Sequence, residues 1–284
     1  MLIGILCLIL SQIAFAITNS LWKNPQKQVG VLSIIAARSF ATASFLGIIV
    51  FFRGEIWLLP KEYLLRTMLF CCINYFGLFF YLQSLKEKQV SEITALGKFS
   101  VLIGIFIGIF YYDEPLTPAG LFAILAILIS IILIELWQDK SKIRWNKSFV
   151  YAILSPIFWS SSFLFKESIS HLGHWNFTFV LEATVCVLSS VALLFSKEKF
   201  SVKPLFTTYK IEYFFLVLLG FIAILCSNYS LHTLPVVVSA LLGLTYPLCT
   251  LLFARFYHQE RLSKMQWIGI IVGIIGVLIY HILS

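Results

Sequence analysis

Three ionisable residues lie inside long apolar stretches of this sequence: Arg38, Lys98 and Glu182. Each falls near the middle of a segment long enough to cross a membrane, where an ionisable group costs about 2.5 to 3.5 kcal/mol on insertion scales. An arginine fork can hold a carboxylate or a phosphate through two parallel hydrogen bonds, and a buried Glu can accept an amine or exchange a proton. Two cations and one anion favour a small anionic or zwitterionic ligand. The alternative is a structural ion pair between Glu182 and one of the two cations.

A second group of candidate binding residues is polar or amphipathic rather than charged. Such side chains suit a pocket in which apolar walls meet a few hydrogen-bonding groups, although they can equally join neighbouring helices. Seven of them complete the predicted substrate-binding set: Asn19, Asn74, Tyr75, Trp159, Asn228, Tyr229 and Tyr246.

The segments that carry these residues have the composition of a membrane protein. The chain is 60% hydrophobic and only 12% charged, whereas an average soluble domain is about 25% charged. A span needs about 20 apolar residues, and its backbone polar groups must be satisfied within the segment, so each such run is predicted to be a helix. The predicted fold class is all-α integral membrane, with ten transmembrane helices over residues 2–21, 29–52, 64–85, 89–111, 116–137, 148–169, 175–195, 211–231, 234–256 and 265–283.

The chain contains two similar halves. Ser11 and Ser155 lie in matching motifs 144 residues apart, and Glu114 and Glu260 lie in matching motifs 146 residues apart. The most polar stretch between spans, residues 138–147, separates these segments. It is therefore predicted to link two repeats.

Five spans in each half imply an inverted repeat. The predicted units are residues 1–140 and 146–284, and because five is an odd number, the second unit must enter the membrane in the opposite orientation. Arg38 and Glu182 are 144 residues apart, so the repeat places them at equivalent positions. Inverted repeats are a recurring construction of secondary transporters, whose binding site lies between the halves near the middle of the bilayer.

Small residues and acids mark further helix features. Gly104-x-x-x-Gly108 and Gly269-x-x-x-Gly273 allow close helix contact, which we expect within the molecule rather than between two copies. Glu114 precedes the fifth span, where an acidic side chain favours the helix N-terminus. Gating is the alternative role for this residue.

Several functional classes find no support in the sequence. The six cysteines lie in apolar stretches without metal-ligand spacing, and no phosphate-binding glycine loop or nucleophile elbow occurs. The net charge of +8 comes from loops that flank spans, where positive charge sets orientation. We therefore expect no cofactor, metal, enzymatic activity or nucleic-acid partner. A membrane-embedded enzyme for lipid-linked substrates remains a rival hypothesis, although Asp113-Glu114 is the only adjacent acidic pair.

Several short motifs resemble those of one transporter family. The pentapeptides Tyr112-Asp113-Glu114-Pro115-Leu116 and His258-Gln259-Glu260-Arg261-Leu262 look like its Glu-x-Leu signature after the fourth and ninth spans. Phe158-Trp159-Ser160-Ser161-Ser162 and Tyr246-Pro247 resemble the first and fourth spans of its second repeat. In their order and spacing these motifs resemble ten-span EamA-type members of the drug/metabolite transporter superfamily. That resemblance implies two inverted five-helix repeats around a central cavity and the export or exchange of small metabolites.

These observations predict a secondary transporter that works by alternating access. The expected substrate is a small polar metabolite such as an amino acid or an organic anion, and the alternative substrate is a phosphorylated or nucleotide-linked metabolite. A proton or a counter-substrate would supply the coupling. We expect a multi-pass protein of the cell (inner) membrane, as a monomer or a weak dimer.

The orientation in the membrane is left open. Loops after the odd-numbered spans carry 15 Lys and Arg residues and the other face carries about 4, which places both termini outside the cytoplasm by the positive-inside rule. The resemblance to EamA-type transporters implies both termini inside.

Overall fold

The structure, a computed structural model, describes residues 2–54, 61–87, 90, 93, 96–115, 117–135, 147–259 and 263–283. The predicted linker, except Lys147, and Glu260 lie outside these ranges. Every regular element in the described ranges is a helix. The elements are α1 (Leu2–Leu21), η1 (Pro25–Lys27), α2 (Val31–Phe52), α3 (Lys61–Leu85), α5 (Lys98–Tyr111), α6 (Pro118–Glu135), α7 (Lys147–Trp159), η4 (Ser160–Leu164), α8 (Phe165–Leu172), α9 (His174–Phe195), α10 (Lys203–Thr207), α11 (Lys210–Thr233), α12 (Val236–Leu242), α13 (Thr245–Tyr257) and α14 (Lys264–Leu283).

Seven segments of the described chain are long and apolar enough to cross a membrane. They are Leu2–Lys27, Val31–Phe52, Tyr63–Leu85, Lys147–Leu172, His174–Phe195, Lys210–Thr233 and Val236–Tyr257. Large apolar side chains such as Phe52, Leu194 and Phe256 are more than three-quarters exposed, as expected for a surface that faces lipid. The chain is thus a multi-pass membrane protein. Three shorter apolar helices, Phe99–Tyr111, Pro118–Ser130 and Lys264–Gly276, lie within other expected spans, and the count of ten stays a prediction.

The sixth expected span is not one continuous α-helix. It consists of α7, which contains Pro156, the 3-10 turn η4 and α8. Ser160 and Ser161 donate their hydroxyls to the carbonyls of Ile157 and Phe158 at 2.6 and 2.7 Å, which competes with the regular α-helical pattern.

The ninth expected span breaks at Gly243, between α12 and α13. Pro247 cannot donate to the Gly243 carbonyl, which instead accepts from Tyr246 N at 3.2 Å. The first half has the same arrangement 146 residues earlier, where Gly97 O accepts from Ser100 N at 3.1 Å and Gly97 precedes α5. The expected kink near Pro247 is therefore present as a broken helix.

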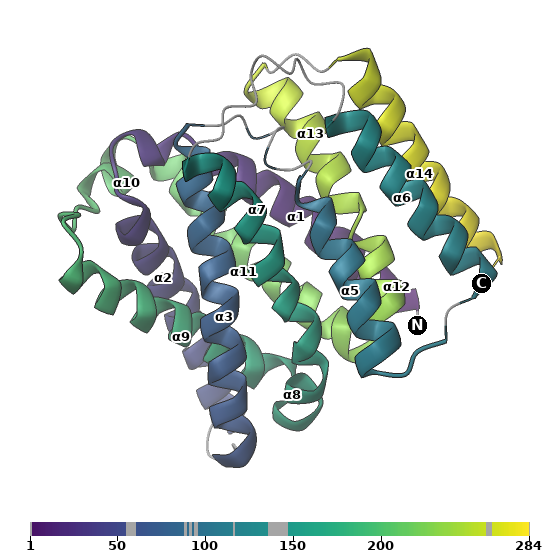
Figure 1. Cartoon of the computed structure of the whole chain (residues 1–284). Coiled ribbons are helices and arrows are strands. Elements are labelled where there is room, and N and C mark those ends of the chain that lie inside the picture. Colours follow the sequence, from purple (N-terminus) through teal and green to yellow (C-terminus); the bar gives the residue numbers. More distant parts are fainter. Residues whose placement is uncertain are drawn as a thin grey trace.

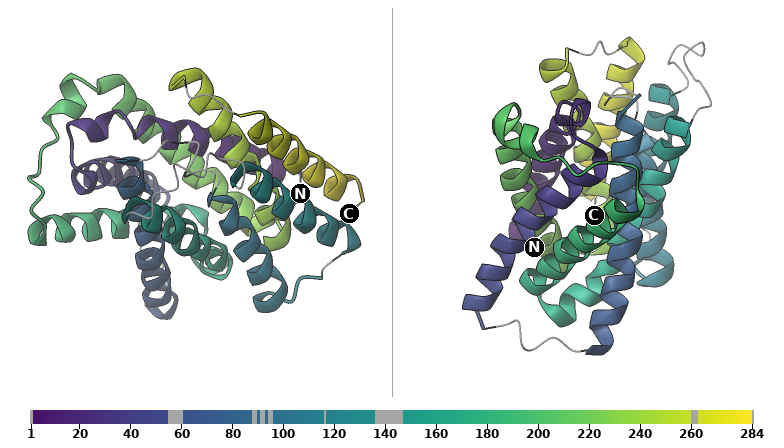
Figure 2. Two further views of the ribbon diagram at one scale, coloured as in Figure 1. Left: turned by 45° about the horizontal axis from the view of Figure 1, so that its top comes forward. Right: turned by 90° about the vertical axis from the view of Figure 1, so that its left-hand side faces the viewer.

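Helices of the two halves pack in pairs. The main neighbours are α1 with α11, α3 with α7, α2 with α9, α5 with α12 and α6 with α14. The pair α6 and α14 stands at one edge of the bundle (Figure 1). Both views of Figure 2 place the start of α1 and the end of α14 near each other. Every main pair joins a helix before residue 136 to one after residue 146.

Glycines create the closest contacts between the halves. A Cβ on Gly104 would lie 2.4 Å from the Phe163 ring, and one on Gly108 would lie 2.6 Å from Val237 Cγ2. In the outer pair of helices, Ser130 Oγ donates to Gly269 O at 2.5 Å. Both glycine motifs thus serve packing inside the molecule.

The backbones of α3 and α7 lie in close contact at Gly77. A Cβ on Gly77 would lie 2.8 Å from Trp159 N, and Ser155 Oγ donates to Gly77 O at 3.0 Å. The absent side chain lets the two helices touch nearly backbone to backbone.

Candidate functional site

A cavity of about 200 Å³ lies between the two halves. Side chains from α1, α2, α3 and α5 of the first half and from α7, η4, α8, α9, α11, α12 and α13 of the second half line it. Gly97 and Gly243, which lie at the equivalent breaks before α5 and α13, are both in its wall. Eight of the ten predicted binding residues line the cavity: Asn19, Arg38, Asn74, Tyr75, Trp159, Glu182, Asn228 and Tyr246.

Arg38 and Glu182 form an ion pair in the cavity wall. Both guanidinium Nη atoms of Arg38 donate to Glu182 Oε1, at 2.9 and 3.0 Å. Arg38 is 5% exposed and Glu182 is 1% exposed, so the two charges offset each other's desolvation. The Arg38 guanidinium carbon also lies 6.0 Å from the centre of the Trp22 ring, within reach of a cation–π interaction. The spacing of 144 residues placed these two residues at equivalent positions of the two halves, and their contact is the ion pair that the structural alternative described.

The ion pair leaves hydrogen-bonding capacity unused. Arg38 Nε and Glu182 Oε2 are buried without a hydrogen-bond partner, and so is Ser239 Oγ in the wall contributed by α12. An unsatisfied buried polar group costs about 1 to 3 kcal/mol. A free donor on Arg38 and a free acceptor on Glu182 could bind a ligand that carries both kinds of group.

Amide and aromatic side chains surround the ion pair. Asn19 Nδ2 donates to Tyr246 Oη at 2.9 Å, which joins α1 to α13. Tyr81 Oη donates to Asn19 O at 3.2 Å, and its ring meets the Trp159 ring edge-on. Asn74 Nδ2 donates to Trp159 O at 3.3 Å. These residues thus contact both the cavity and each other, as both interpretations of the sequence allowed.

Two of the predicted residues are not among the lining side chains. Asn228 donates to Thr178 Oγ1 at 2.8 Å and lines the cavity, whereas Tyr229 turns away and stacks edge-on against His174. Successive residues of a helix point about 100° apart, and the Tyr229 ring is directed to His174 of α9 while Asn228 faces the cavity. Lys98 begins α5, and its side chain lies outside the described part of the structure.

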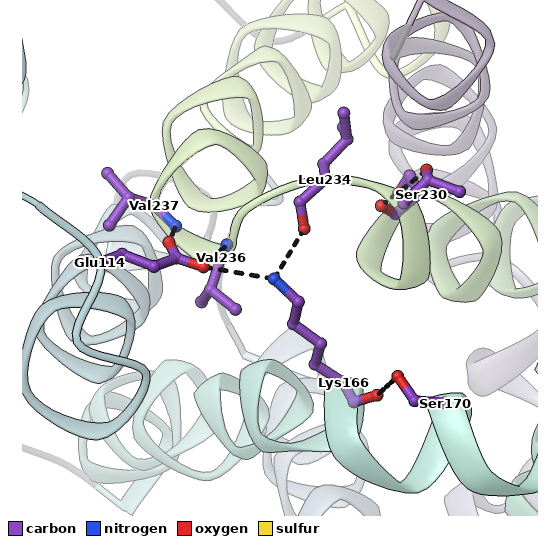
Figure 3. A network of polar contacts seen from close by, with 8 residues as sticks. Glu114, Lys166, Ser170, Ser230, Leu234, Val236 and Val237 are labelled. Atoms are coloured by element: carbon purple, nitrogen blue, oxygen red, sulfur yellow. Dashed lines mark hydrogen bonds and ion pairs between the residues drawn. The ribbon is translucent and has the colours of Figure 1, made fainter.

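Two carboxylates that were not predicted as site residues connect the halves. Glu114, in the loop after α5, accepts from Val236 N and Val237 N at 2.7 Å each, so it caps α12 rather than the expected following helix. It also accepts from Lys166 Nζ at 3.2 Å (Figure 3). Glu198, in the loop after α9, accepts from Ser33 N at 2.9 Å, near the start of α2. Both carboxylates bind backbone amides, and every residue type except proline has one, so the sequence does not identify these partners. The Glu-x-Leu motif was the one feature that drew attention to Glu114.

The described part of the chain thus forms a helical, multi-pass membrane protein with a largely apolar cavity between two halves, which holds a buried ion pair. The sequence model of the EamA-like transporter family matches it twice, over residues 2–136 and 146–281. The chain belongs to the EamA-like transporter family. Membership of a transporter family indicates a membrane transport protein rather than an enzyme, and it confirms the resemblance found in the sequence.

Solved structures share this fold. One of them, titled "Crystal structure of protein", superposes with a TM-score of 0.75 over 100% of this chain and 96% of its own, at 18% sequence identity. No curated protein sequence matches the chain significantly. At that identity the structural likeness establishes the fold alone.

Proposed function

We propose that this protein is a secondary transporter that exports or exchanges a small zwitterionic metabolite by alternating access. The observation that carries the proposal is the Arg38–Glu182 pair, which lies in a cavity lined by both halves and keeps one unused donor and one unused acceptor. A carboxylate and an ammonium on one small molecule would satisfy both atoms. A protein of this kind would act in the cell membrane.

The pairing of helices supports an inverted repeat. If α1, α2, α3, α5 and α6 correspond to α7–α8, α9, α11, α13 and α14, exchanging the halves leaves unchanged the pairs that α1 and α3 make with α11 and α7, the pair of α2 with α9 and the pair of α6 with α14. The pair α1 with α11 becomes α7 with α3, and the pair α2 with α9 maps onto itself. Two interchangeable halves around one site are what alternating access requires.

The broken helices at Gly97 and Gly243 also support transport. Discontinuous helices at corresponding positions of two repeats are typical of substrate sites in secondary transporters, since an interrupted helix exposes backbone groups to a ligand. Both breaks lie in the cavity wall.

Charge balance favours a zwitterion over a phosphorylated substrate. Among the described side chains that line the cavity, the positive charge of Arg38 is paired with the negative charge of Glu182. A phosphate group would need an excess of positive charge at the site. The phosphorylated or nucleotide-linked alternative therefore depends on Lys98.

A double variant separates substrate binding from a structural role of the ion pair. Removing one partner leaves a buried charge unpaired and costs about 3 to 5 kcal/mol of stability, so single variants are uninformative. An apolar pair of similar volume is often neutral for stability. We expect Arg38→Met/Glu182→Leu to fold, yet to lose counterflow of labelled amino acids in proteoliposomes by about tenfold or more, from lost charged hydrogen bonds.

The matched control is Arg66→Met/Glu167→Leu, which makes the same change at a pair whose side chains are 36% and 35% exposed. We expect it to keep the thermal stabilisation that substrate gives to the wild-type protein. Full counterflow in a folded Arg38→Met/Glu182→Leu variant would reject the binding site. Counterflow of sugar phosphates but not of amino acids would favour the alternative substrate class.

A further inference from the structure

A cluster of charged and backbone groups lies beyond one end of the cavity. Lys166, near the start of α8, donates through Nζ to Glu114 Oε1 at 3.2 Å and to Leu234 O at 3.0 Å. Leu234 is in the link between α11 and α12, and Glu114 also holds the first amides of α12. Figure 3 shows the Lys166 side chain extending from α8 to these groups. We call this the Lys166 end of the cavity.

The cluster directly adjoins the cavity wall. Phe165, next to Lys166 in the chain, lines the cavity, as do Leu231 and Ser239, which lie three residues before Leu234 and three residues after Val236. The Lys166 side chain thus joins the wall contributed by α8 to the wall contributed by α11 and α12. The bridge therefore lies at the edge of the cavity lining, between two of the elements that form it.

The contacts of Glu114 differ in how easily they separate. The bonds from Glu114 to α12 belong to a packed unit, since Gly108 of α5 meets Val237 of α12 directly. Lys166 reaches this unit from another helix through one long, flexible side chain, which is 26% exposed. Its ammonium can leave Glu114 without breaking the cap on α12.

The neighbouring charges leave Lys166 with a single carboxylate partner. Glu167 is paired with Arg66 of α3 at 2.8 Å. Tyr112, whose ring lies 5.7 Å from Lys166 Nζ, stays uncharged because burial raises the pKa of its phenol to about 12. Glu114 therefore accounts for the ion pairing of Lys166 in the described part of the chain.

We propose that Lys166 is the separable part of a gate that closes the cavity at the Lys166 end by bridging Glu114 and the Leu234 carbonyl. When α8 moves away from the start of α12, both contacts of the ammonium break and the cavity opens at this end. The gate rests on the proposed transport function, because alternating access requires such a closure at each end. Lys166 acts on the movement of substrate and does not contact it.

Cysteine accessibility tests the gate without a substrate. In a background without the six native cysteines, Ser239→Cys reports on the Lys166 end, and Ser100→Cys reports on the wall formed by α5. Labelling by a polar maleimide is measured in lipid nanodiscs, where both faces are exposed, so the membrane orientation does not matter. Loss of a charged hydrogen bond shifts an equilibrium by about tenfold or more. We expect Lys166→Met to raise the labelling rate at position 239 by about tenfold and to raise the rate at position 100, which lines the same cavity on α5, by a smaller factor.

Lys203→Met is the matched control, because Lys203 lies on the exposed helix α10, and it should alter neither rate. Lys166→Gln is the second variant if Lys166→Met does not fold. An unchanged rate at position 239, or an equal rise at both positions, would overturn the gate. Absence of counterflow in the wild-type protein would reject the transporter proposal. The labelling rates would still test whether Lys166 closes the cavity, because that measurement uses no substrate.

Discussion

The two ends of the cavity are closed by different chemistry. At the Lys166 end, an ammonium, a carboxylate and two backbone amides converge. At the opposite end, which we call the Trp22 end, the end of α1 meets the end of α13 through contacts that involve no carboxylate among the described residues: His258 Nε2 lies 2.9 Å from Ser20 O, and Asn24 Nδ2 donates to Tyr257 Oη at 3.3 Å.

Each half also caps a helix of the other half with a carboxylate. Glu114 caps α12, and Glu198 caps the start of α2. A lysine binds the capping carboxylate only in the Glu114 case, among the contacts that the described residues make. The two repeats therefore share a capping device, while the charged bridge across the cavity is specific to one end. Closure at the Lys166 end should be the more sensitive to charge substitution.

The largest expected effect comes from Glu114→Ala. This change leaves the amides of Val236 and Val237 without their acceptor and Lys166 without its carboxylate, and each orphaned buried donor costs about 1 to 3 kcal/mol. We expect a loss of about 3 kcal/mol or more, measured as a lower midpoint of thermal unfolding in nanodiscs. A loss no larger than that of Glu198→Ala would show that the two caps are equivalent.

A smaller loss, about 1 to 2 kcal/mol, is expected for Glu198→Ala, which removes a helix cap but no lysine partner. Gly30→Ala should act through the same contact, because its new Cβ would lie 1.9 Å from Glu198 Cδ. The two changes combined should therefore cost less than the sum of their separate effects. Additive losses in thermal unfolding would contradict this link.

Lys166→Met should lower stability by only about 1 kcal/mol, since part-exposed ion pairs contribute little. A double-mutant cycle with Glu114→Gln measures the coupling between the two side chains. We expect a coupling that weakens in 1 M salt. A coupling near zero at low salt would show that the two side chains do not interact.

The smallest effect is expected at the Trp22 end. Tyr257→Phe removes one exposed hydrogen bond to Asn24 and should change the unfolding midpoint by less than the equivalent of about 0.5 kcal/mol. Labelling of cavity cysteines should stay unchanged. A large rise in labelling would show that contacts without a carboxylate hold this end as firmly as charges hold the other.

The sequence predicted the membrane segments well where apolar runs are uninterrupted. The first span was expected at residues 2–21, and α1 covers Leu2–Leu21. The helix breaks were harder to predict. Pro156 and Pro247 indicate a kink, but the positions of η4 and of the break at Gly243 depend on which carbonyls accept other donors.

Within the candidate site, the repeat was more informative than local pattern. The offset of 144 residues placed Arg38 and Glu182 at equivalent positions of the two halves, whereas no local sequence motif relates these two residues. Tyr229 was selected because it is polar and lies within a span, yet its side chain faces His174. Lys166 looked like an ordinary charge near a span end, because its partners lie 52 and 68 residues away in the chain.

The contact at Gly77 has a consequence for how the bundle can move. Because α3 meets Trp159 of α7 almost backbone to backbone, the two helices cannot slide apart without losing dense packing. They should tilt together as one rigid rod that spans both repeats. Such a rod widens the molecule at one surface of the bilayer only by narrowing it at the other.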